Sequence, residues 1–168
     1  MASQNPIDVA VSCDGINALV RAIRQEADGK ELRKELAKNL RDALKPAAVQ
    51  AKSGIMSMSS SGVGPRSSPA LRSAIAKKIR PEVKLGGRWT GAKVKARKTP
   101  NIRGFTNAPK RTQSDTWRTQ SWGNGVWRNQ PGKLDWFDRA TTAHKAEYKQ
   151  AVFEALEVMA ERIANRAH

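Results

Sequence analysis

The sequence predicts an α+β fold in which a small, mostly antiparallel sheet packs against N-terminal helices and a long C-terminal helix, with two long loops. Several segments have apolar residues every three or four positions, which is the period of a helix with one buried face. Between Ala92 and Arg97 apolar and basic residues alternate, which is the period of a half-buried strand. The chain of 168 residues predicts a single domain, 1–168, because two domains would each have a thin core.

The N-terminal part predicts a short edge strand and two helices. Residues 6–12 alternate weakly in polarity, as a strand does. Helical spacing predicts a first helix over 16–27 and a second helical pattern that continues to about Lys52. Pro46 lies inside the second pattern and has no backbone donor, so we expect a kink or a boundary near Leu44.

The polar positions of these helices are typical of a solvated face. Glu26 and Lys30 lie four positions apart, as do Lys38 and Asp42. Opposite charges at this spacing stabilise an exposed helix surface by a few tenths of a kcal/mol. We assign no functional site to these helices.

A loop, a third helix and a basic strand are predicted next. The Ser, Gly, Met and Pro composition of 53–68 predicts a mobile loop or arm, because such a segment buries too little apolar surface to offset its chain entropy. Ser68 followed by Pro69 is a strong helix start, and the apolar stripe of this helix runs to Ile79. A strand is then predicted over 88–98.

The C-terminal part predicts a second loop, a hairpin and the longest helix. Residues 99–113 contain two prolines and no periodicity, which predicts a basic loop. Trp122 and Trp127 flank a Gly-Asn-Gly turn, which predicts a β-hairpin. Asp135 is predicted to cap one long helix that ends near Asn165.

The positive charge is concentrated in the middle of the chain. The net charge is +16, and the segment 72–111 contains thirteen Lys or Arg against one acid, a net +12. The preceding part contributes +3 and the following part +1, so both flanks are nearly neutral. Such an excess predicts a negatively charged partner.

No catalytic, metal or cofactor site is predicted. Cys13, His144 and His168 offer no zinc spacing, and a lone cysteine is typical of a small buried side chain in a reducing compartment. Asp135 and Asp138 are better explained by helix capping than by paired acid–base catalysis. With no secretory signal and no apolar run long enough for a membrane span, we expect a soluble non-enzyme made in the cytoplasm.

A series of short motifs, taken in order, suggests a family. They are Leu-Arg-Lys-Glu-Leu at 32–36, Leu-Arg-Ser-Ala-Ile-Ala at 71–76, Lys-Val-Lys-Ala-Arg at 93–97, Trp-Gly-Asn-Gly-Val-Trp at 122–127, Asn-Gln-Pro-Gly at 129–132 and Trp-Phe-Asp-Arg-Ala at 136–140. In this order the chain resembles the tail-component or tail-completion neck proteins of long-tailed phages, especially those of actinobacterial hosts, over most of its length. Relatives often have His-Pro-Val-Phe-Gly where this chain has Gln120 to Gly123, so the subfamily is open.

The resemblance implies a structural virion protein that assembles in the host cytoplasm. It would form a ring, with six copies expected, at the head-proximal end of the tail. That ring would join the tail tube or tail terminator to the head-closure or connector protein, around the channel through which duplex DNA passes. The family brings no catalytic residue. The tail terminator or another connector ring of the same neck is the alternative within this class.

A charge comparison limits how many cations face DNA. Duplex DNA has one phosphate per roughly 1.7 Å, so a ring about 30 Å tall meets about three phosphates per subunit of a hexamer. Only a few cations of the +12 segment are therefore expected at the channel, and the others are expected to meet acidic surfaces of adjoining rings. The predicted contact residues, for the channel or an acidic partner, are Lys93, Lys95, Arg97, Lys98, Arg103, Lys110 and Arg111.

Two further interpretations complete the predictions. Five tryptophans and the basic strand also allow a stand-alone DNA- or RNA-binding protein, in which aromatic rings stack on bases. Packing in the core or between subunits is the favoured interpretation of the aromatic residues. The residues predicted for this packing are Trp117, Trp122, Trp127, Trp136 and Phe137.

Overall fold

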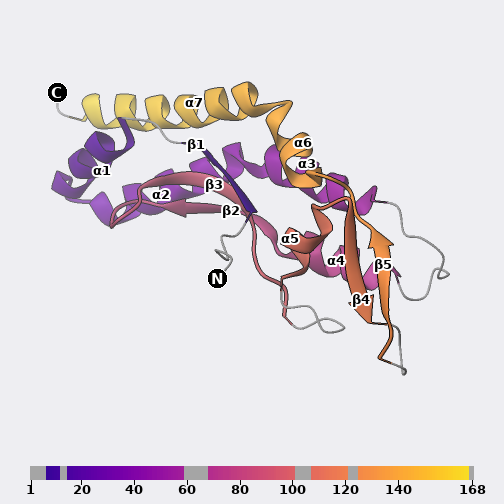
Figure 1. The fold of residues 1–168 in the computed structure, drawn as a ribbon. Coiled ribbons are helices and arrows are strands. Elements are labelled where there is room, and N and C mark those ends of the chain that lie inside the picture. The colour runs from indigo at the N-terminus through magenta and orange to yellow at the C-terminus, as the bar shows by residue number, and fades with distance from the viewer. Residues whose placement is uncertain (1–6, 12–14, 59–67, 101–106, 121–124, 167–168) are drawn as a thin grey trace. The chain divides into compact units, whose positions relative to one another are not determined.

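The computed structural model describes residues 7–11, 15–58, 68–100, 107–120 and 125–166 (Figure 1). Within these ranges the chain has seven helices and two small sheets, which confirms the α+β class. The chain divides into two compact units. Unit 1 comprises Met1–Asp8, Ala48–Arg80 and Lys95–Ala143, and unit 2 comprises Val9–Ala47, Pro81–Val94 and His144–His168.

The elements follow one another in a mixed order. They are β1 (Ile7–Val11), α1 (Gly15–Gln25), α2 (Gly29–Ala43), α3 (Lys45–Met56), α4 (Ser68–Lys77), β2 (Ile79–Lys84), β3 (Gly91–Ala96), α5 (Ala108–Thr112), β4 (Thr116–Gln120), β5 (Trp127–Pro131), α6 (Trp136–Thr142) and α7 (Lys145–Ala164). The first sheet has the strand order β1-β3-β2 and the second consists of β4 and β5. Strand β2 is therefore an edge strand among the described strands, and it contains Pro81, a residue type that sheets tolerate mainly at an edge.

In unit 2 the helices α1, α2 and α7 form the core. Leucines at every fourth position of α2, Leu32, Leu36 and Leu40, are fully buried. The close approach of α1 and α2 requires Gly29, because a Cβ there would lie 2.2 Å from the carbonyl oxygen of Ile23. The remaining buried residues of α1 and α7 are Ile16, Val20, Ile23, Tyr148, Val152, Leu156 and Met159.

In unit 1 the core is built around the start of α6. Trp136 and Phe137 are fully buried, and their rings meet edge to face with centroids 5.6 Å apart. The Trp136 indole Nε1 donates a hydrogen bond to the Thr112 hydroxyl at 3.2 Å, which ties α6 to α5. Strands β4 and β5 pair antiparallel, with Thr116 opposite Pro131 and Gln120 opposite Trp127, so the predicted hairpin is confirmed.

The predicted helix boundary near Leu44 is confirmed, whereas five other predictions are wrong in whole or in part. Helix α3 continues to Met56 and Met58 is buried, so the predicted loop does not begin at Ser53. Residues 59–67 of that prediction lie outside the described residues. Helix α4 ends at Lys77, and Ile79 belongs to β2 rather than to a helical stripe.

The second predicted loop, 99–113, contains the short helix α5. Its buried Thr112 donates to the Ala108 carbonyl at 2.9 Å, a local contact that the sequence pattern did not show. Residues 101–106 of this loop lie outside the described part of the chain.

The predicted single C-terminal helix is divided into α6 and α7 between Thr142 and Lys145. Asp135 precedes α6 in a left-handed conformation, with φ 51°, and its side chain makes no capping hydrogen bond. The expected cap is therefore wrong.

Candidate anion-binding surfaces

The predicted basic strand exists, but β3 is shorter than the predicted 88–98 and ends before Arg97. In β3 the small apolar residues Ala92, Val94 and Ala96 are buried, while Lys93 and Lys95 between them are half-buried. The Lys93 ammonium lies 4.5 Å from the ring centroid of Trp89, a cation–π contact that holds this side chain. The alternation of small apolar and cationic residues thus produces one buried and one polar face.

The other predicted contact residues are distributed over separate elements. Arg97 and Lys98 follow β3 and are exposed, and Lys110 and Arg111 are exposed on α5. The Thr99 hydroxyl accepts a hydrogen bond from the Ala108 backbone N–H at 3.3 Å, which helps to fix α5. Arg103 lies outside the described residues.

The aromatic residues occupy three different environments. Trp136 and Phe137 belong to the core of unit 1. Trp117 is half-buried, and its Nε1 donates to the Pro131 carbonyl at 3.3 Å. Trp127 is 48% exposed, with the Arg118 guanidinium 5.9 Å from its ring centroid, so it is not a core residue of this chain. Trp122 lies outside the described residues.

A basic groove on α2 was missed by the sequence analysis. Its volume is about 350 Å³ and it lies in unit 2, between α2 and the end of β2. We call it the α2 groove. It is lined by Lys30, Arg33, Lys34, Ala37, Arg41, Val83 and Leu85. All four cations are exposed, and Arg33 donates a hydrogen bond to the Leu85 carbonyl.

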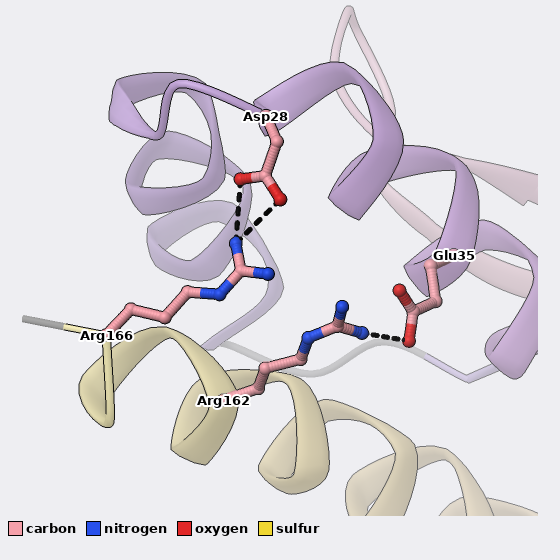
Figure 2. A network of polar contacts seen from close by, with 4 residues as sticks. All are labelled: Asp28, Glu35, Arg162 and Arg166. Carbon is pink, nitrogen blue, oxygen red and sulfur yellow. Dashed lines mark hydrogen bonds and ion pairs between the residues drawn. The ribbon is translucent and has the colours of Figure 1, made fainter.

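Glu35 of α2, and Asp28 immediately before the helix, face α7 (Figure 2). Glu35 accepts a hydrogen bond from Arg162 of α7. Asp28, which immediately precedes α2, accepts two bonds of 2.7 Å from Arg166 Nη1. The hydrogen bond from Arg166 lowers the pKa of Asp28, and the same bond raises the pKa of Arg166.

Helical geometry explains why the charges of α2 separate. At 3.6 residues per turn the four groove cations fall within an arc of roughly 100°, and Glu31, Glu35 and Asp42 fall about a third of a turn away. The buried leucines occupy the remaining face. The groove residues of α2 are at 30, 33, 34, 37 and 41, separated by three, one, three and four positions, and this helical spacing was the signal that would have revealed the groove.

The described residues contain neither a metal-binding cluster nor a helix that could cross a membrane. Among the described residues, no three His, Cys, Asp or Glu side chains are grouped so that they could hold a metal ion. Within the same ranges, none of the helices combines the length and apolar character that crossing a bilayer requires.

Comparisons of the chain with protein-family models, with curated proteins and with solved structures give no match. Any function must therefore be argued from the residues and their geometry.

Proposed function

We propose that the protein is a structural component of a phage neck, which forms a ring at the head-proximal end of the tail and joins it to the head-closure protein. The order of motifs from 32–36 to 136–140 supports this family. The ring would surround the passing duplex DNA without enzymatic activity, and the assembled virion would be its location.

The exposure of Trp127 is the observation that favours assembly. A tryptophan that is 48% exposed on a hairpin keeps a large apolar surface in water, and Val126 beside it is 51% exposed. Tryptophan is enriched among the residues that dominate protein–protein binding. Of the two roles predicted for Trp127, core packing does not fit this exposure and subunit or partner contact does.

The exposed cations of unit 1 suit docking between rings. Arg97, Lys98, Lys110 and Arg111 are all exposed, and Arg118 adds a cation beside Trp127. Charges at the rim of an interface mainly guide approach and register, whereas an aromatic anchor supplies affinity. A hairpin that offers both is a reasonable contact surface for an acidic neighbouring ring.

Electron microscopy of the purified protein tests the proposal, alone and mixed with tails and DNA-filled heads that were assembled without it. We expect rings at one end of the tails and restored head–tail joining. A monomer that attaches to neither tails nor heads would overturn the proposal.

A matched pair of variants tests the role of the hairpin. Trp127→Ser should reduce ring yield or joining about 30-fold, the effect of losing a residue that contributes about 2 kcal/mol. Val49→Ser on α3 is the control, because Val49 is also exposed, at 61%, and belongs to the same unit. Equal losses in both variants, or in neither, would exclude a specific contact through Trp127.

A further inference from the structure

The α2 groove concentrates positive charge without a lining acid. Of its seven lining residues four are cations, and the other three are Ala37, Val83 and Leu85. The acids of α2 are elsewhere: Glu35 is paired with Arg162, and Asp42 is paired with Lys45 at 2.7 Å. The groove therefore keeps its charge uncompensated by the lining residues themselves.

This arrangement is unfavourable for the isolated helix. Lys30 and Lys34 lie four positions apart on the same face, and like charges at that spacing destabilise a helix by a few tenths of a kcal/mol. A bound anion would remove this repulsion. Relief of the repulsion between Lys30 and Lys34 therefore favours the binding of an anionic ligand.

The groove is also partly organised before any ligand binds. The hydrogen bond from Arg33 to the Leu85 carbonyl fixes one guanidinium at the end of β2. A Cβ placed on Gly86 would lie 2.9 Å from Arg24 Nη2 and 3.6 Å from Arg33 Nη2, so guanidinium groups from α1 and α2 both reach this turn. Arg24 therefore adds a fifth cation beside the groove. Fixed guanidinium groups lose less side-chain entropy when they bind phosphate or carboxylate.

The lining favours phosphate over an acidic protein. A protein partner usually needs an apolar anchor pocket, but Leu85 is only 5% exposed and Val83 is half-buried. Lysine is depleted from protein–protein interfaces, and here it supplies two of the four cations. Contacts to nucleic-acid backbones, by contrast, are commonly made by Lys and Arg.

The dimensions agree with a row of phosphates. Lys30 and Arg41 are eleven residues apart, about 16 Å along the helix axis. A DNA strand rises about 3.4 Å per nucleotide, so this length spans about five phosphates. Among the described residues that line the groove there is no Asn, Gln or aromatic side chain, the residue types that recognise or stack on bases.

We propose that the α2 groove binds the phosphate groups of a nucleic-acid backbone, independently of base sequence. The cations Lys30, Arg33, Lys34 and Arg41 make the contacts, with Arg24 at one end. This inference does not rest on the proposed neck ring, since it uses only residues of unit 2.

Fluorescence anisotropy with a short labelled DNA duplex tests the proposal on the full chain. Affinity is measured between about 50 and 200 mM salt, because each phosphate contact contributes about −0.9 to the slope of log K against log salt. The test variant is Lys30→Gln, Lys34→Gln and Arg41→Gln combined, which keeps Arg33 and its bond to Leu85. We expect the slope to become shallower by about 2 to 3 and affinity at about 100 mM salt to fall more than 10-fold.

The control variant removes the same charge from unit 2 outside the groove. It combines Arg21→Gln, Lys38→Gln and Lys145→Gln, which are exposed helix positions that do not line the groove. We expect its affinity to fall less than about 3-fold. Equal effects of the two triple variants, or no binding by the unaltered protein, would overturn the proposal.

Three further measurements make the result specific. Ala37→Glu places a carboxylate in the middle of the groove without removing a cation, and we expect it to weaken duplex binding as the triple variant does.

Poly-L-glutamate tests the acidic-protein alternative. If the groove variants no longer bind this polymer but still bind the duplex, the phosphate assignment is wrong. Inorganic tripolyphosphate separates the phosphate sources. If it displaces the duplex completely at equimolar phosphate, the groove binds free phosphate and not a backbone. Ring formation can fail while these results hold, so the two proposals are tested separately.

Discussion

Helix α2 and the hairpin of β4 and β5 expose their charged residues in opposite ways. On α2 the leucines face the core, Glu35 faces α7 and four of the five cations line the groove. On the hairpin, cationic and aromatic residues are neighbours, as Arg118 over Trp127 shows. The helical period of 3.6 sorts residues into three faces, whereas a two-stranded ribbon has only two faces and both can meet water.

The difference shows that net charge is a poor guide to where cations converge. Helix α2 has five cations and three acids, yet it produces the α2 groove. The segment 72–111 has a net +12, yet its cations are distributed over several elements of both units. A surface of one sign suits a row of phosphates, and an exposed tryptophan with neighbouring cations suits a protein surface.

The largest effect on stability is expected at Trp136, a buried aromatic residue of unit 1. Trp136→Ala should lower the free energy of unfolding by about 3–5 kcal/mol, because a fully buried indole is removed and the Thr112 hydroxyl loses its donor. Urea denaturation followed by circular dichroism measures this change.

The hairpin provides the contrast for that measurement. Trp127→Ala should cost less than about 1 kcal/mol, since an exposed ring with one cation–π contact contributes little to the fold. A loss as large as that of Trp136→Ala would mean that Trp127 stabilises the fold, and its role as a contact residue would lose support.

A smaller effect is expected at the start of α2. Gly29→Ala should destabilise the protein by about 1–3 kcal/mol, because the new methyl group would meet the Ile23 carbonyl oxygen at 2.2 Å. Gly15→Ala is the matched control, since a Cβ there meets nothing within 4 Å, and it should be neutral or stabilising by up to about 1 kcal/mol. Thermal unfolding of both variants checks the pair. If both were neutral, the tight junction that orients α2 and its groove would not exist.

The smallest effect concerns the acidic side of α2. The hydrogen bond from Arg166 lowers the pKa of Asp28 below its ordinary value of 3.8. A lowered aspartate pKa means that the folded state prefers the ionised form, so the contribution is fully present above pH 3.8 and is lost as pH falls through the lowered pKa. Asp28→Asn should slightly reduce the Tm at neutral pH, and this difference should disappear in strong acid.

The partner variant completes this measurement. Arg166→Gln should give the same loss of pH dependence, and the double variant should add nothing to either single change. A difference in Tm between Asp28→Asn and the unaltered protein that is constant across all pH values would contradict the pairing.

Local patterns predicted most elements because their causes are local. The leucines of α2, the alternation of β3 and the pairing of β4 with β5 each follow from one period or one turn signal. The errors arose where a long-range contact decided the outcome. Helix α5 depends on Thr99 and Thr112, and α3 extends past Ser53 because Gly54 and Ile55 are buried in unit 1.

The site was only partly predictable for the same reason. The basic strand follows from adjacent residues, so Lys93 and Lys95 were identified on a polar face. The α2 groove also needs Val83 and Leu85 beside α2, and sequence alone does not show that proximity. The separation of acids from cations on α2, however, was already present in the helical spacing.

The pairing of Glu35 with Arg162, on the side of α2 away from the groove, has a kinetic consequence. The carboxylates are paired with cations, whereas the described lining of the groove has four cations and no acid, so the positive charge of unit 2 is displaced toward the groove and gives a dipole across the width of α2. In the field of a highly charged polymer such a dipole turns unit 2 before the surfaces touch, so that more encounters begin in a productive orientation. The distribution of charge would then affect the association rate constant of the complex more than its lifetime.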